Sequence, residues 1–157
     1  MKSTIVVFGS STGTCENIAN TIAEKLGVEA INVTDFSADT IANHDNLILG
    51  TSTWGAGELQ DDWYDGVNVL KDADLSGKTV AIFGCGDSES YSDTFCAAMK
   101  EIYDAAEGAN IIGSISTDGY TFDDSDAVVD GKFIGLPLDD VNEDDKTEGR
   151  IDAWLDS

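Results

Sequence analysis

The sequence is poor in basic residues for its acid content. Its 157 residues include 8 lysines and arginines against 31 aspartates and glutamates, which gives a formal net charge of -23. Nucleic acids and anionic membranes attract basic surfaces, so this balance argues against both as partners. It suits a protein that meets basic partners, because complementary fields speed encounter. Excess acid that only keeps the chain soluble is the alternative interpretation.

Histidine, cysteine and long apolar runs are equally scarce. His44 is the one histidine, and Cys15, Cys85 and Cys96 form no CxxC pair. These counts argue against a zinc centre, histidine-based catalysis and a disulfide framework. No apolar run approaches the roughly 20 residues of a membrane span, and the N-terminus lacks a signal-peptide pattern. We therefore expect a cytoplasmic protein with no metal site and no catalytic residues.

Short apolar runs alternate with helical patterns along most of the chain. The patterns predict strands at 4–8, 29–33, 46–50, 79–83, 109–113 and 132–136, and helices at 16–26, 39–43, 59–70, 92–106 and 148–155. Gly27 is expected to end the first helix. Such alternation predicts one α/β domain with a parallel sheet and helices on both faces. The polar segment 114–131 is interpreted as an insertion looping out of the last strand.

Three loops, at 9–14, 51–58 and 84–91, follow the first, third and fourth predicted strands. Ligands of open parallel sheets bind at this carboxyl edge, so we expect one composite site there. The first loop runs into a helix N-terminus, which favours an anion. It lacks the lysine of a P-loop, so a monophosphate fits better than a triphosphate. An ordinary helix cap rich in serine and threonine is the alternative. The loop's candidate ligands are Ser10, Ser11, Thr12, Gly13 and Thr14.

The other two loops each contain an aromatic residue among small or polar ones. Trp54 lies in the second loop, and Tyr91 follows Asp87 in the third. Two rings on facing loops can sandwich a planar heterocycle. Either ring alone is more often packing in the core or at the surface.

Taken together, these stretches resemble the flavodoxins, and the long-chain subgroup in particular. The resemblance rests on SSTGT-x-E after the first strand, on TSTWGAGELQDDW, on FGCGDSESYSDTF, and on the polar segment that leads into the last helix. It implies a single doubly wound domain over residues 1–157, with five parallel strands in the order 2-1-3-4-5 and a long-chain insertion at 114–131. It also implies an electron carrier, not an enzyme, that binds FMN non-covalently and shuttles between its semiquinone and hydroquinone.

The resemblance assigns roles to individual positions. Residues 10–14 would hold the FMN phosphate, Trp54 would cover the inner face of the flavin ring, and Tyr91 the outer face. The Gly55–Ala56 peptide would turn its carbonyl toward the ring when the flavin is reduced. Cys15 stands where the family usually has threonine. The remaining candidate contacts are Ser52, Thr53, Gly57, Cys85, Gly86, Asp87, Asp93 and Thr94.

The expected partners are basic docking faces of redox proteins, such as ferredoxin/flavodoxin-NADP reductase and low-potential acceptors. Glu58, Asp61, Asp62 and Asp65 form the candidate docking surface of a monomer. Two other functions compete. A receiver domain would need acids at the end of the first strand, which here ends in Phe8-Gly9-Ser10. A quinone reductase would need a substrate pocket, for which the sequence has no additional domain.

Overall fold

The computed structural model describes residues 4–9, 14–54, 58–59, 63–73, 75, 77–85, 99–106, 108–113, 115–116, 127–129, 132–138 and 144–155. Every structural statement below concerns these residues. Residues 92–98 of the helix predicted at 92–106, including Cys96, lie outside them. None of the described helices is long and apolar enough to cross a membrane.

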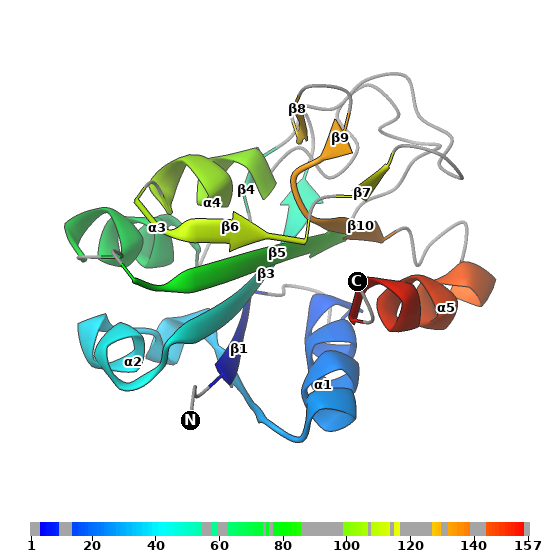
Figure 1. The fold of residues 1–157 in the computed structure, drawn as a ribbon, viewed down its shortest axis with the longest axis horizontal. Coiled ribbons are helices and arrows are strands. Elements are labelled where there is room, and N and C mark those ends of the chain that lie inside the picture. The colour runs from blue at the N-terminus through cyan, green and yellow to red at the C-terminus, as the bar shows by residue number, and fades with distance from the viewer. Residues whose placement is uncertain are drawn as a thin grey trace.

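A parallel sheet forms the centre of the molecule (Figure 1). Its strands are β1 (Thr4–Gly9), β2 (Glu29–Asn32), β3 (Asn46–Trp54), β5 (Thr79–Cys85), β6 (Asn110–Ile112) and β10 (Leu136–Leu138). In space they run β2-β1-β3-β5, with β6 and β10 both beside β5. This is the predicted order 2-1-3-4-5, with the fifth position shared by two strands, and it confirms the doubly wound fold.

Successive residues of each strand are buried on opposite faces of the sheet. Ile5, Val7 and Leu47 face one core with helices α3 (Trp63–Asp72) and α4 (Met99–Ala105). Val6 and Ile48 face a second core with helices α1 (Thr14–Leu26) and α5 (Asp144–Leu155). Strands covered on both faces must be apolar at nearly every position, which explains the continuous apolar runs of the sequence.

Helix α1 ends at the predicted glycine. Gly27 has a positive φ of 69°. The Val28 N–H donates to Ala23 O at 2.9 Å, and the Gly27 N–H donates to Glu24 O at 3.3 Å. These are the two bonds of a Schellman motif, whose left-handed residue glycine adopts at least cost. After β2, the chain makes a 3₁₀ turn, η1 (Val33–Asp35), and the helix α2 (Ala38–Asn43) that the sequence predicts.

The fifth position of the sheet is interrupted. β6 pairs with β5 from Thr79 to Ala81, whereas β10 pairs with β5 from Phe83 to Cys85. Between them the chain forms a small antiparallel sheet of β7 (Ile115–Ser116), β8 (Val128–Val129) and β9 (Lys132–Phe133). β7, β8 and β9 therefore lie outside the parallel sheet. β7 and β8 fall within the insertion predicted at 114–131.

Three predicted elements need correction. Residues 132–136 are not one strand, because β9 belongs to the antiparallel sheet and β10 to the parallel one. Leu59 is not helical, because it lies in β4 (Glu58–Leu59) and pairs with Thr53 of β3. The last helix begins at Asp144, four residues before its predicted start at Glu148.

Candidate functional site at the carboxyl edge of the sheet

The carboxyl ends of three neighbouring strands lie at one edge of the sheet. Gly9 of β1 pairs with Thr51 of β3, and Thr51 pairs with Gly84 of β5. β3 and β5 stay paired one residue beyond Thr51 and Gly84, where Ser52 lies beside Cys85. The strands that precede the three predicted loops are therefore adjacent. Since neighbouring strands lie about 4.8 Å apart, the three ends together span about 10 Å.

Helix α1 begins directly after the segment that leaves β1. Its first residue is Thr14, two positions before the predicted start. The first N–H groups of a helix have no partner inside it, and those within α1 belong to residues 14–16. They and the positive end of the helix dipole favour an anion beside the end of β1. The backbone N–H of Cys15 is therefore one of the donors available to such an anion.

β3 and β4 form a tight hairpin at this edge. Trp54 pairs with Glu58, and Thr53 pairs with Leu59. Only Gly55, Ala56 and Gly57 connect the paired residues 54 and 58. The sequence pattern missed this hairpin, although two glycines between Trp54 and Glu58 are a signal for a short hairpin turn. The peptide predicted to change orientation thus belongs to a connection whose two ends are fixed by the ladder.

Trp63 fixes the start of α3 to the sheet beneath the hairpin. It is fully buried, and its Nε1–H donates to the carbonyl oxygen of Gly50 at 2.6 Å. Its ring packs at a tilt against Phe36, with 6.0 Å between the centroids. The ring also lies so close to Gly66 that a Cβ there would approach Trp63 Cε3 to 2.7 Å. The sequence pattern does not reveal this hydrogen bond.

The structure brings together the backbones of some predicted site residues. Thr14 and Cys15 open α1, Ser52, Thr53 and Trp54 end β3, and Cys85 ends β5. The remaining candidates lie outside the described residues: Ser10, Ser11, Thr12, Gly13, Gly55, Ala56, Gly57, Gly86, Asp87, Tyr91, Asp93 and Thr94. Within the described part of the chain, no three His, Cys, Asp or Glu residues are grouped as a metal site.

Nearly the whole chain matches one protein family. A family model described as Flavodoxin matches residues 6–154. Flavodoxin 1 of Azotobacter vinelandii is 43% identical over 159 residues, which cover 96% of this chain and 91% of that protein. The chain belongs to the flavodoxin family. Flavodoxin 1 of Escherichia coli K12 is 40% identical over 161 residues, covering 99% of this chain and 92% of that protein.

Solved flavodoxin structures share the fold. The crystal structure of Fusobacterium nucleatum flavodoxin bound to flavin mononucleotide superposes with a TM-score of 0.92 at 31% identity, covering 99% of this chain and 96% of that chain. Its K13G mutant, also bound to flavin mononucleotide, gives 0.93 and covers 100% of this chain and 95% of that chain. The split fifth position and the paired ends of β1, β3 and β5 are therefore features of a chain with the flavodoxin fold.

Proposed function

We propose that this flavodoxin binds FMN without a covalent link at the carboxyl edge of its sheet and carries electrons between redox enzymes. The observation that supports this most directly is the strand register. It sets the ends of β1, β3 and β5 side by side, with the free N–H groups of α1 next to them. Such an edge offers an anion site and a broad neighbouring surface, which is what a phosphate joined to a flat ring requires.

The first turn of α1 and the end of β3 suit the two parts of this cofactor. The phosphate would accept hydrogen bonds from the first turn of α1 and from the proposed ligands Ser10, Ser11, Thr12, Gly13 and Thr14. Each hydrogen bond to a charged oxygen is worth about 1.5–3 kcal/mol, so several hold an anion without a basic side chain. The flavin ring would lie beside the end of β3, between Trp54 and Tyr91. FMN supplies the redox chemistry, and the protein binds it and adjusts its potentials.

The hairpin supports a role for the Gly55–Ala56 peptide. We propose that its carbonyl accepts a hydrogen bond from the flavin in the one-electron-reduced form. Glycine adopts both positive and negative φ at low cost, so Gly55 permits both orientations of the peptide. The ladder between Trp54 and Glu58 fixes the ends of the connection. Only these few residues would then need to change conformation.

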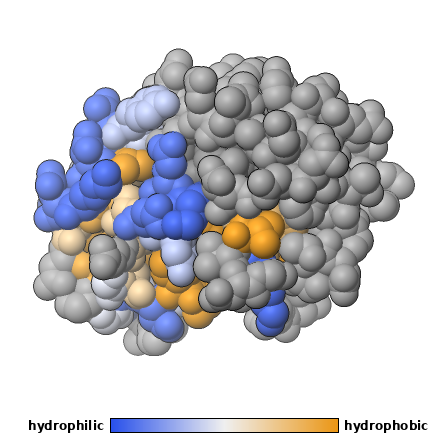
Figure 2. All heavy atoms as spheres, turned by 90° about the horizontal axis from the view of Figure 1, so that it is seen from above, coloured by the Kyte–Doolittle hydropathy of each residue, from blue (hydrophilic) through white to orange (hydrophobic). Residues whose placement is uncertain are grey.

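We place the chain in the long-chain subgroup and propose that it acts as a cytoplasmic monomer. The small sheet between β6 and β10 supports the subgroup. Its partners would present basic faces, such as that of a ferredoxin/flavodoxin-NADP reductase. Figure 2 shows hydrophilic side chains gathered on the side of α3 and α4. Exposed acids there include Asp65, Asp72, Glu101 and Asp104, and Asp65 belongs to the candidate docking surface.

Stepwise anaerobic reduction of the purified protein, followed by absorption, tests the proposal. We expect flavin bands in the oxidised protein and two separate one-electron steps, with a long-wavelength band after the first. The protein should oxidise NADPH only slowly unless a reductase is added. A protein that shows no flavin bands even after incubation with FMN would refute the proposal. Rapid NADPH oxidation by the protein alone would instead indicate a flavin enzyme.

A further inference from the structure

A cavity of about 530 Å³ lies at the opposite end of the sheet from the proposed FMN site. Its wall includes Thr4, Asn46 and Thr79, which are the first residues of β1, β3 and β5. A strand rises about 3.3 Å per residue, so the eight steps from Asn46 to Trp54 separate the two sites by about 25 Å. A ligand in this cavity would therefore not contact FMN.

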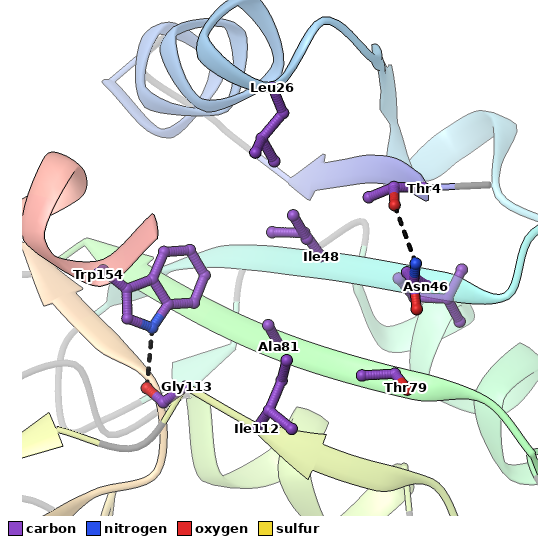
Figure 3. Close-up of a pocket in the computed structure, with 10 residues that line it drawn as sticks. Thr4, Leu26, Asn46, Ile48, Thr79, Ala81, Ile112, Gly113 and Trp154 are labelled. Atoms are coloured by element: carbon purple, nitrogen blue, oxygen red, sulfur yellow. Dashed lines mark hydrogen bonds between the residues drawn. The ribbon is translucent and has the colours of Figure 1, made fainter. Parts of the chain in front are cut away.

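Two parallel rows of side chains form the floor of the cavity. In the first row the register places Thr4 beside Asn46 and Asn46 beside Thr79. The Asn46 Nδ2–H donates to Thr4 Oγ1 at 3.1 Å (Figure 3). Two residues further along each strand, on the same face, lies an apolar row. A ligand that covered both rows would need one polar end and an apolar body.

The middle residue of the apolar row has the smallest side chain. Ala81 pairs with Ile48 on one side and with Ile112 on the other. Its single methyl group leaves space that the two larger side chains do not fill. The helices above stand apart at this point, and Figure 3 shows Leu26 of α1 and Trp154 of α5 reaching toward the floor from two sides.

The rim exposes apolar surface that a soluble protein usually buries. Leu26 is 41% exposed and Ile112 is 50% exposed. Among the described residues, Tyr64 on α3 is the one other exposed large hydrophobic residue. Two of these three residues therefore border one cavity. Exposed apolar groups gathered around a hollow with a few convergent polar groups are typical of a ligand pocket.

Trp154 gives the cavity a fixed aromatic wall. Its Nε1–H donates to the carbonyl oxygen of Gly113 at 2.8 Å. A Cβ on Gly113 would come within 2.7 Å of Trp154 Nε1, so the indole edge packs directly on the backbone there. Trp154 is only 6% exposed, so the indole is a rigid part of the cavity wall that needs no further ordering when a ligand binds.

The charges near the cavity favour a neutral ligand. Among the described residues, those that line it are all uncharged. Lys25, next to Leu26, pairs with Asp152 of α5 at 2.8 Å, so the two charges beside the mouth offset each other. An anion would also meet the field of a molecule with net charge -23. We propose that this cavity binds a small neutral, mainly apolar molecule carrying one hydroxyl or amide group.

Fluorine NMR on the FMN-loaded protein tests this site independently of the proposed function. The chain has three tryptophans, Trp54, Trp63 and Trp154, so labelling with 5-fluorotryptophan gives three resonances. The probe is 1-naphthol, with the anion 1-naphthoate as its charged counterpart. We expect 1-naphthol to shift the Trp154 resonance in a saturable way and to leave the other two in place. 1-Naphthoate should bind at least tenfold more weakly.

Three variants link the signal to the cavity. Ala81→Leu fills the hollow and should weaken 1-naphthol binding at least tenfold. Leu26→Asp places a charge at the exposed mouth, where folding tolerates it, and should weaken binding as well. Tyr64→Asp makes the same kind of change at an exposed position on α3, away from the cavity, and should leave binding unchanged. The proposal is wrong if both cavity variants bind like the parent, or if all three resonances shift together without saturation.

Discussion

At the scale of single residues, Gly50 shows how closely the sheet is packed below the proposed site. A Cβ on Gly50 would lie 2.0 Å from Cζ of Phe83, whose ring is fully buried. The ring occupies the space where a side chain would start, so glycine is required here by packing and not by backbone conformation. The same residue accepts the hydrogen bond from Trp63. A change at Gly50 therefore disturbs both faces of the sheet.

The first prediction is that Gly50→Ala destabilises the protein by about 1–3 kcal/mol, the usual cost of overpacking a core. Urea denaturation at a fixed FMN concentration measures it. Gly149→Ala is the matched control, because a Cβ there meets nothing within 4 Å and Gly149 lies in helix α5. That change should stabilise the protein by about 0.5–1 kcal/mol. Equal effects of the two changes would contradict the packing argument.

The second prediction concerns Cys15, the second residue of α1. Its backbone N–H lies in the first turn, where it has no partner inside the helix, but a thiol is a weaker donor than the hydroxyl of the usual threonine. Cys15→Thr should therefore tighten FMN binding by on the order of 1 kcal/mol, the net value of one hydrogen bond. Titration of the FMN-free protein with FMN measures the change.

Cys15→Ser and Cys15→Ala separate the hydroxyl from other effects of that substitution. Serine should bind FMN as tightly as threonine does, and alanine no more tightly than cysteine. If threonine and alanine gave the same affinity, the hydroxyl would have no part in phosphate binding.

At the scale of elements, strand order was predictable and strand ends were not. Period and composition identify buried strands and amphipathic helices, and βα alternation limits the topology to few choices. β3 nevertheless continues to Trp54, because Thr53 and Trp54 pair with Leu59 and Glu58. That pairing depends on a turn rather than on periodicity. The change of sheet between β9 and β10 likewise depends on tertiary contacts that local patterns do not encode.

The candidate site was predictable only as a location. The sequence indicates which loops meet, and the register places the strands before them side by side. It does not indicate what supports those loops. The hydrogen bond from Trp63 to Gly50 joins residues 13 positions apart and is invisible to local pattern. We therefore regard Trp63 as a positioning residue for the hairpin above it.

The third prediction tests that role. Trp63→Phe keeps an aromatic ring but removes the Nε1–H. The carbonyl oxygen of Gly50 then loses this buried hydrogen bond, which should lower the free energy of unfolding by about 1–3 kcal/mol. Because α3 is then released from β3, we also expect FMN to bind several-fold more weakly. Urea denaturation and FMN titration measure the two effects.

Trp154→Phe is the matched control for this prediction. It removes a similar hydrogen bond, from Trp154 Nε1 to Gly113 O, on the opposite face of the sheet. Its stability should fall by a comparable amount while its FMN affinity stays unchanged. If both variants lost FMN affinity in proportion to their stability, Trp63 would be a core residue and nothing more.

At the scale of the whole molecule, the net charge of -23 should oppose the second reduction of bound FMN, which leaves the flavin anionic. Like charges at short range disfavour the charged form. The fourth prediction is that the second midpoint potential rises between about 0.01 M and about 0.1 M salt, where the Debye length falls from about 30 Å to about 10 Å. Spectroelectrochemistry measures it. A potential that does not respond to salt would indicate that stacking and desolvation dominate.

The same charge should also limit folding stability at low salt. The ion pairs among the described residues include Lys25–Asp152, Lys78–Asp45 and Lys100–Asp104, and the acid of each is at least half exposed. Exposed pairs contribute about 0–1 kcal/mol each. Added salt weakens both these attractions and the repulsion among the 31 acids. Because the attractions contribute little, the weaker repulsion should outweigh their loss. The net effect of added salt should be stabilising.

The fifth prediction is that the urea midpoint rises over the same range of salt. Two exposed residues in strands provide matched variants: Glu29 at the start of β2 and Lys132 in β9. Glu29→Gln removes one negative charge and should raise the low-salt midpoint, whereas Lys132→Gln removes one positive charge and should lower it. Both differences should shrink as salt is added, because screening weakens every term of the repulsion. Variants that shifted the midpoint in the same direction, or by amounts independent of salt, would show that local contacts rather than the summed charge set the stability.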